Sequence, residues 1–138
     1  MYHELHTRSA FSFLRAASQP EALADRAGAL DLPVVALSDR NGFYGSVRFH
    51  QRALESGFRA AVGTELSMED GTVLPVLIRS REAYRNVSRL VTRAQLRSPK
   101  GECPVAWSEL EELAEGTSIL TGDEEGPLDI GWRRDGRR

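Results

Sequence analysis

Polar and apolar positions alternate along the chain in short blocks, and each block predicts a strand or a helix. Residues 2–5 predict a short strand, followed by a polar loop. Apolar residues then recur at spacings of three and four, at Leu23, Ala27 and Leu30, which predicts a helix over about residues 19–30. The apolar run at residues 33–37 predicts a strand buried on both faces. A strand, a helix and a strand in this order predict a parallel crossover.

The rest of the chain continues this alternation. The predicted elements are, in order, a helix over residues 45–56 that ends at Gly57, a strand over 58–62, a hairpin between 65–68 and 73–77, a helix over 81–96, a short helix from Ser108 and a strand over 118–121. Residues 122–138 have little periodic apolar content, so we expect them to be mostly unstructured. Regular alternation of strands and helices predicts an α/β sheet or barrel.

Two segments of the type Ser-x-x-Glu predict capping boxes. Ser18 with Glu21 would open the first helix, and Ser108 with Glu111 would open the short one. In such a box the serine hydroxyl accepts the N–H of the glutamate, whose carboxylate reaches back to the N–H of the serine.

Composition narrows the class of protein. With 138 residues, 41% of them hydrophobic and 28% charged, and a formal net charge of -2, the chain has the make-up of one soluble globular domain. Its single cysteine, Cys103, excludes a disulfide framework and a multi-cysteine metal site, and favours a cytoplasmic location. The apolar runs are all shorter than the roughly 18 residues that span a bilayer, so we expect no membrane partner.

Polar residues follow three of the predicted strands, at residues 6–9, 38–42 and 63–65. Functional groups in parallel α/β folds gather at the C-terminal ends of the strands. We therefore expect these three loops to converge on one site.

Five segments resemble the PHP (polymerase and histidinol phosphatase) domain found at the N-terminus of bacterial replicative and error-prone DNA polymerases of the polymerase III alpha type. They are LHTRSAFSFL at residues 5–14, LSDRNGFYG at 37–45, GTE at 63–65, YRNVSRLVT at 84–92 and LTGDEEGPL at 120–128. Their order and spacing also match that family, and the last two are similar to its error-prone branch.

The resemblance implies an α/β fold, namely a distorted seven-stranded β/α barrel of which this chain forms roughly the first half. It implies a truncated PHP domain over residues 1–128, after which we expect a disordered, arginine-rich tail over residues 129–138. A barrel cut near its middle leaves two unpaired strand edges, near residues 2–5 and 118–121. Such edges pair with other chains, so we expect self-association.

The resemblance also implies positions for metal ligands. Active PHP domains hold two or three divalent metal ions and hydrolyse phosphoesters, and His6, Asp39 and Glu65 fall on ligand positions. Arg8 and Arg40 fall where the metal-binding members have histidine. A guanidinium stays protonated and has no lone pair to give, so neither arginine can replace an imidazole ligand. We expect His6, Asp39 and Glu65 to be a vestigial metal site, without a bound cofactor or a catalytic residue.

The preferred interpretation is therefore the N-terminal PHP part of an error-prone DNA polymerase, acting as a scaffold and interaction domain. Its parent would carry out DNA-directed DNA synthesis, translesion synthesis and DNA repair, and its partners would be the rest of the polymerase chain and DNA. We expect the chain to be inactive by itself, since it lacks the polymerase domains. The alternative is a metal-dependent phosphoesterase or proofreading exonuclease that uses His6, Asp39 and Glu65 with zinc or manganese.

A stripe of arginines adds a third interpretation, a small nucleic-acid-binding module. Arginines at every fourth position step by about 40° each, so that five wrap roughly 160° of the helix; they are Arg81, Arg85, Arg89, Arg93 and Arg97. Residues 79–97 hold six arginines and one acid, Glu82, a local charge of +5. Such a stripe can contact phosphates, but it can equally pair with acids of a neighbouring helix, such as Glu109, Glu111 and Glu112.

The other candidate residues favour structural roles. Cys103 lies in a loop without a histidine nearby in sequence, so we expect an ordinary free thiol. The acidic run of Asp123, Glu124 and Glu125 could attract a cation, but charge runs of this kind are usually solvated.

Overall fold

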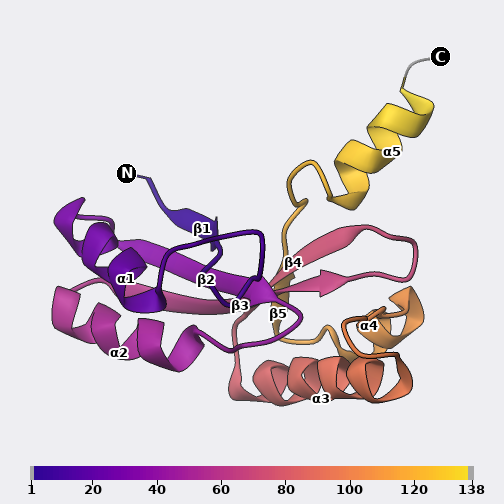
Figure 1. The fold of residues 1–138 in the computed structure, drawn as a ribbon, viewed down its shortest axis with the longest axis horizontal. Helices are drawn as coiled ribbons and strands as arrows, with labels where there is room; N and C mark the ends of the chain where they lie inside the picture. The colour runs from indigo at the N-terminus through magenta and orange to yellow at the C-terminus, as the bar shows by residue number, and fades with distance from the viewer. Residues whose placement is uncertain (1, 137–138) are drawn as a thin grey trace. The chain divides into compact units, whose positions relative to one another are not determined.

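A computed structural model describes residues 2–136 of the chain, apart from the side chain of Leu113. Its elements follow one another (Figure 1) as β1 (Glu4–Thr7), α1 (Pro20–Ala29), β2 (Val34–Arg40), α2 (Ser46–Ser56), β3 (Arg59–Ser67), β4 (Val73–Ile78), α3 (Arg81–Arg97), α4 (Trp107–Leu113), β5 (Thr117–Ile119) and α5 (Pro127–Asp135). The strands form a sheet in the order β1-β2-β3-β4-β5, which leaves β1 and β5 as end strands and does not close into a barrel. The prediction of an α/β fold is confirmed.

The chain divides into two compact units, residues 1–64 and 65–138. The first unit is a β-α-β crossover followed by a second helix. β1 and β2 pair in parallel, with Glu4 opposite Val35, as the alternation predicts. The core of this unit consists of Ala24, Ala27, Val35, Leu37, Phe49, Ala53 and Phe58. Phe49 and Phe58 meet edge to face with ring centroids 5.8 Å apart, so α2 and the start of β3 are joined through aromatic packing.

A tight turn joins β3 to β4 in the second unit, where Asp70 and Gly71 predict one. Met68 donates its N–H to the carbonyl of Thr72 over 2.8 Å. The Asp70 carboxylate accepts the N–H and the hydroxyl of Thr72, at 2.9 and 2.6 Å, and the indole N–H of Trp107, at 2.9 Å. The turn is thus fastened to the first residue of α4.

Helix α3 is amphipathic, and its apolar face contributes five residues to the buried core of the second unit. Its buried residues are Ala83, Val87, Leu90, Val91 and Ala94. Ser80 caps the helix, because its hydroxyl oxygen accepts the N–H of Ala83 at 3.0 Å. The predicted helix over residues 81–96 is confirmed, and β5 pairs with β4 in antiparallel orientation.

The two helix starts differ from the predicted capping boxes. Helix α1 begins at Pro20 after Gln19, which makes no side-chain cap. A proline favours the first helical position, because its φ is already fixed near the helical value. Helix α4 begins at Trp107, where the carboxylate of Glu109 accepts the N–H of Ala106 at 3.1 Å. The reaching-back carboxylate is therefore not that of Glu111.

The end of the chain also differs from the expectation of an irregular tail, because α5 occupies residues 127–135. Pro127 stands in its first turn, and Asp129 pairs with Arg133 one turn later, at 2.8 Å. These are local signals, so they act without the periodic apolar face that the sequence lacks. Arg137 and Arg138, which belong to the same expectation, lie outside the described residues.

None of the helices within residues 2–136 combines the length and the apolar character that crossing a bilayer requires.

Gly57 ends α2 in the left-handed conformation, with φ of 79°, and its N–H donates to the carbonyl of Ala53. A Cβ at this position would meet no atom within 4 Å, so the cost of a side chain is conformational. We expect Gly57→Ala to lower the free energy of unfolding by about 1 kcal/mol, and Gly57→Asn by less. Urea unfolding of purified protein measures both.

Gly131→Ala is the matched control. Gly131 lies within α5, also with open space around its Cβ position, but without a positive φ. Alanine there should leave the free energy of unfolding unchanged or raise it. An equal loss in both variants would contradict the left-handed cap.

Candidate functional site

Asp39 lies near the end of β2 and is only 2% exposed. Its Oδ1 accepts three hydrogen bonds, from the N–H of Ser9 at 2.8 Å, the hydroxyl of Ser9 at 2.9 Å and the hydroxyl of Ser12 at 2.8 Å. Its Oδ2 accepts the hydroxyl of Ser9 at 2.8 Å. The carboxylate therefore joins the loop after β1 to the end of β2, within the first unit.

Further hydrogen bonds around the Asp39 backbone tighten this junction. The Ser12 hydroxyl oxygen accepts the N–H of Arg40 at 3.1 Å. Thr64, in β3, donates its hydroxyl to the Asp39 carbonyl at 2.9 Å and accepts the N–H of Gly42 at 3.0 Å. The loops after β1 and β2 thus share one hydrogen-bond network with Thr64. The predicted loop at residues 63–65 is instead part of β3, which continues to Ser67.

Gly45 leaves room for the Asp39 side chain. A Cβ at residue 45 would lie 2.7 Å from Oδ2 of Asp39 and 3.0 Å from side-chain carbons of Leu37 and Pro20. Real Cβ atoms essentially never show the 2.7 Å contact, so the Asp39 carboxylate would have to shift, and contacts of 3.0 Å are tighter than most real ones. Glycine therefore fits the start of α2 beside the buried carboxylate without a shift.

A carboxylate offers about four lone-pair positions, and three donor hydrogens are directed at Asp39: the Ser9 N–H, the Ser9 hydroxyl, which lies between the two carboxylate oxygens, and the Ser12 hydroxyl. Asp39 therefore acts as a structural acceptor that links two loops. The sequence motif contains both serines, but only the folded chain shows that they face Asp39.

The other two predicted ligands lie in different units. His6, in β1 of the first unit, is half-buried and donates its backbone N–H to the Glu4 carboxylate at 3.0 Å. Glu65, in β3, begins the second unit and is fully buried. One oxygen of Asp123 lies within 4.8 Å of an oxygen of Glu65. Asp123 is thus not simply part of a solvated charge run, because the segment after β5 brings it beside a buried acid.

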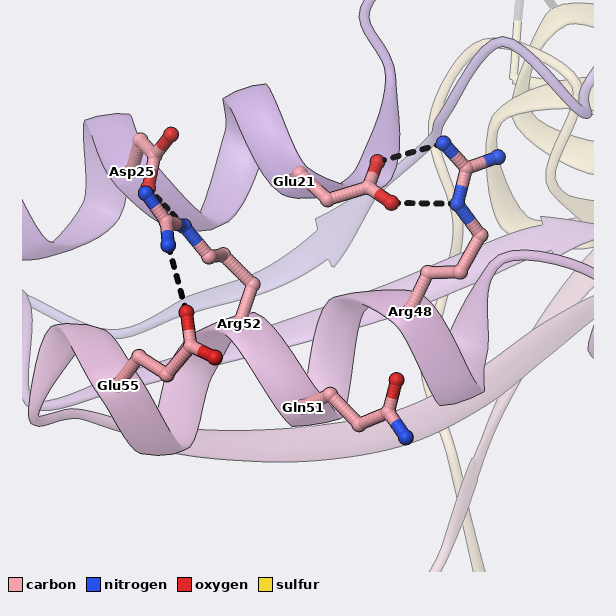
Figure 2. Close-up of a pocket in the computed structure, with 6 residues that line it drawn as sticks. All are labelled: Glu21, Asp25, Arg48, Gln51, Arg52 and Glu55. Carbon is pink, nitrogen blue, oxygen red and sulfur yellow. Dashed lines mark hydrogen bonds and ion pairs between the residues drawn. The ribbon is translucent and has the colours of Figure 1, made fainter.

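A surface pocket of about 320 Å³ lies between α1 and α2 (Figure 2), lined by Glu21, Asp25, Arg48, Gln51, Arg52 and Glu55. Arg48 forms a two-bond pair with Glu21, and Arg52 bridges Asp25 and Glu55. These bonds lower the pKa of Glu21 and raise the pKa of Arg52. The charged side chains that line the pocket therefore form ion pairs that join α1 to α2.

The five arginines of the predicted stripe all lie on exposed positions of α3. Arg97 donates to both oxygens of Glu109, at 2.6 and 2.7 Å, and to the carbonyl of Pro104, at 2.7 Å. The pair with Arg97 lowers the pKa of Glu109. The ion-pairing alternative therefore holds for Arg97, with one of the three acids expected.

Cys103 is buried at 6% exposure, with its sulfur 3.8 Å from the carbonyl of Val91. Burial raises the pKa of the thiol, although the charge of Arg97 acts against this shift. A thiol whose pKa is raised is mostly protonated at neutral pH, which does not suit a nucleophile.

Comparison with known protein families matches residues 4–137 to the PHP domain. The chain belongs to the PHP domain family. Its sheet of five strands, which does not close, agrees with the predicted partial barrel.

Curated relatives of this PHP domain are named error-prone DNA polymerase. The protein from Mycolicibacterium paratuberculosis is 42% identical over 137 residues, which cover 91% of this chain and 12% of the relative. That from Brucella abortus is 44% identical over 115 residues, 79% of this chain and 11% of the relative. The protein from Corynebacterium efficiens is 47% identical over 93 residues, which cover 67% of this chain and 9% of the relative. The chain thus spans about a tenth of the length of these relatives.

Two solved structures share the fold of this PHP domain. A metal-dependent phosphoesterase from Bifidobacterium adolescentis aligns with a TM-score of 0.53 and 20% identity, covering 67% of this chain and 32% of that one. An amidohydrolase from Chromobacterium violaceum aligns with a TM-score of 0.57 and 22% identity, covering 70% and 34%. At these identities the likeness concerns the fold alone.

The role of Asp39 as an acceptor can be tested through its partners. We expect Ser12→Ala to lower the free energy of unfolding by about 1–3 kcal/mol, because it leaves a buried carboxylate and the Arg40 N–H each short of one bond. The matched control is Ser18→Ala, at an exposed serine that forms no cap. That change should stay within about 0.5 kcal/mol. Urea unfolding that finds equal effects in the two variants would contradict the proposed network.

Proposed function

We propose that this chain is the PHP portion of an error-prone DNA polymerase and that it serves as a scaffold and interaction domain, without phosphoesterase activity of its own. The observation that carries this proposal is the buried carboxylate of Asp39, which holds the loop after β1 to β2 through hydrogen bonds from Ser9 and Ser12. A residue on a family ligand position is thereby committed to structure.

The two arginines of the motifs support the same function. Arg8 and Arg40 stand on positions where the family resemblance implies histidine. A guanidinium cannot ligate a metal ion, and its charge repels one. Two positions of the family's ligand set are thus unsuited to a metal here, and Asp39 is held by Ser9 and Ser12, so His6, Asp39 and Glu65 are a vestigial site in this proposal.

The cellular role is inferred from the relatives. Their shared name supports participation of the whole protein in DNA synthesis, including translesion synthesis and repair. Since these relatives are about ten times longer than the matched segment, the partners proposed for this PHP domain are the other domains of such a polymerase. A cytoplasmic location is part of the same proposal.

A second candidate function is a metal-dependent phosphoesterase or exonuclease. One observation favours it: the carboxylates of Glu65 and Asp123 approach within 4.8 Å in the second unit. Two close carboxylates suit a divalent cation, and one structural neighbour is named a metal-dependent phosphoesterase. Zinc or manganese would be the cofactor in that case.

Metal binding and hydrolysis separate the two candidates. We expect elemental analysis of the purified chain to find less than stoichiometric zinc and manganese, and a chromogenic phosphodiester to be hydrolysed no faster than in buffer with either metal added. The double variant Arg8→His/Arg40→His should behave the same way, because Asp39 is still held by the hydrogen bonds from Ser9 and Ser12.

Glu65→Gln and Asp123→Asn are the controls for a contrary result. Stoichiometric metal together with hydrolysis that both variants abolish would establish the second candidate and overturn the scaffold proposal. Activity gained by the double histidine variant would show that the arginines, and not the Asp39 network, suppress metal binding.

Self-association belongs to the same proposal, because β1 and β5 end the sheet and β5 has only three residues. An end strand presents unpaired N–H and C=O groups that another chain can pair with. Sedimentation of the purified chain should therefore reveal concentration-dependent dimers or larger species. A monomer at all concentrations, with slow amide exchange in both strands, would contradict this expectation.

A further inference from the structure

Helix α3 is divided lengthwise into an apolar face and a basic face. At about 100° per residue, its buried residues Ala83, Val87, Leu90, Val91 and Ala94 fall within one arc of roughly 100°. Counted from Arg81, they lie between about 180° and 280°, whereas Arg81, Arg85, Arg89 and Arg93 lie between about 0° and 120°. The four arginines therefore point away from the core of the second unit.

The surroundings of these four residues leave most of their charge exposed. Within the part of the chain that the structure describes, the nearest acid on the same face is Glu82, which lies 3.9 Å from Arg85, with both side chains more than 60% exposed. A pair at that distance and exposure has little strength. Arg97 is different, since both of its terminal nitrogens donate to the Glu109 carboxylate. The charge of Arg93 also acts on Glu109, but Arg93 forms no hydrogen bond with it. Of the stripe, the part from Arg81 to Arg93 thus remains exposed to an outside anion.

The spacing of the four suits a polymeric anion better than a small one. Residues four apart rise by about 6 Å along the axis, so Arg81 and Arg93 are separated by about 18 Å. A single phosphate cannot contact both ends of such a row, whereas a phosphodiester backbone presents charge after charge at comparable intervals. The planar fork of arginine matches phosphate oxygens two at a time.

We propose that the arginine face of α3, made up of Arg81, Arg85, Arg89 and Arg93, binds the phosphodiester backbone of DNA without reading its sequence. Charge complementarity carries the proposal, and DNA is chosen among polyanions because the curated relatives are DNA polymerases. An acidic protein surface is the competing occupant. The inference concerns a face of the second unit and does not depend on whether the chain binds metal.

The experiment measures the salt dependence of DNA binding by fluorescence anisotropy with the full chain. Two duplexes of equal length and unrelated sequence should bind with equal affinity. The logarithm of the binding constant should fall linearly with the logarithm of the salt concentration. Its slope should reach about 3.6 in magnitude, which is about 0.9 for each of four phosphate contacts. Affinity would then drop about 150-fold between 50 and 200 mM salt. A single strand should show a slope nearer 2.8, at about 0.7 for each contact.

The decisive variant is Arg85→Gln/Arg89→Gln/Arg93→Gln. Glutamine is a good helix former and the three positions are exposed, so circular dichroism should show an intact fold. The slope on duplex should fall by about 2.7, leaving only a three- to fourfold loss of affinity over the same salt range. If the triple variant unfolds, the three single variants should each lower the slope by about 0.9.

The matched control removes the same charge elsewhere, through Arg26→Gln/Arg59→Gln/Arg134→Gln, three exposed arginines outside α3. Its slope should equal that of the parent protein. An equal fall in control and test variants would show diffuse charge attraction and overturn the proposal. Absence of binding by the parent at 25 mM salt would overturn it as well and would point to a protein partner for this face.

Discussion

A carboxylate almost fully removed from water has to find donors, and in this chain Ser9 and Ser12 supply them to Asp39. Burying an ionised group without such partners costs several kcal/mol, so the loop after β1 has to adopt the conformation that delivers both hydroxyls. The same requirement explains why Gly45 stands where α2 begins, since a Cβ there would meet Oδ2 of Asp39. The arrangement of the first unit around the end of β2 depends on this one group.

The second unit is organised around the amphipathic helix α3, which carries its buried apolar residues on one face and its arginines on another. One arginine of that helix, Arg97, joins α3 to α4 through Glu109, and Cys103 is buried against the Val91 carbonyl of α3. The remaining arginines contribute little to that packing. One face of such a helix can pack against the core while the opposite face stays exposed. The period of 3.6 residues per turn determines on which face each charged residue lies.

Local patterns predicted some elements well because their causes are local. The end of α2 followed from Gly57, and the turn between β3 and β4 from Asp70 and Gly71, since each needs only a few neighbouring residues. The predicted capping boxes were wrong because the contacts at these helix starts are not confined to neighbouring residues. Glu109 caps α4 while it is held by Arg97, twelve residues earlier, and a pattern confined to four residues cannot contain that contact. Helix α5 was not predicted, because its sequence carries no apolar stripe; its local features are a proline in the first turn and an ion pair between Asp129 and Arg133.

The sequence by itself determined the α/β class, the parallel crossover of the first unit and the family, because hydrophobic periodicity and short motifs are properties of neighbouring residues. It also showed that Arg8 and Arg40 have no lone pair to offer a metal, which follows from residue type alone. Only the tertiary structure decided that Asp39 accepts hydrogen bonds from Ser9 and Ser12, that Asp123 approaches Glu65 and that Arg97 pairs with Glu109. Hydrogen bonds and ion pairs join residues far apart in sequence, and their partners depend on distances that exist only after folding.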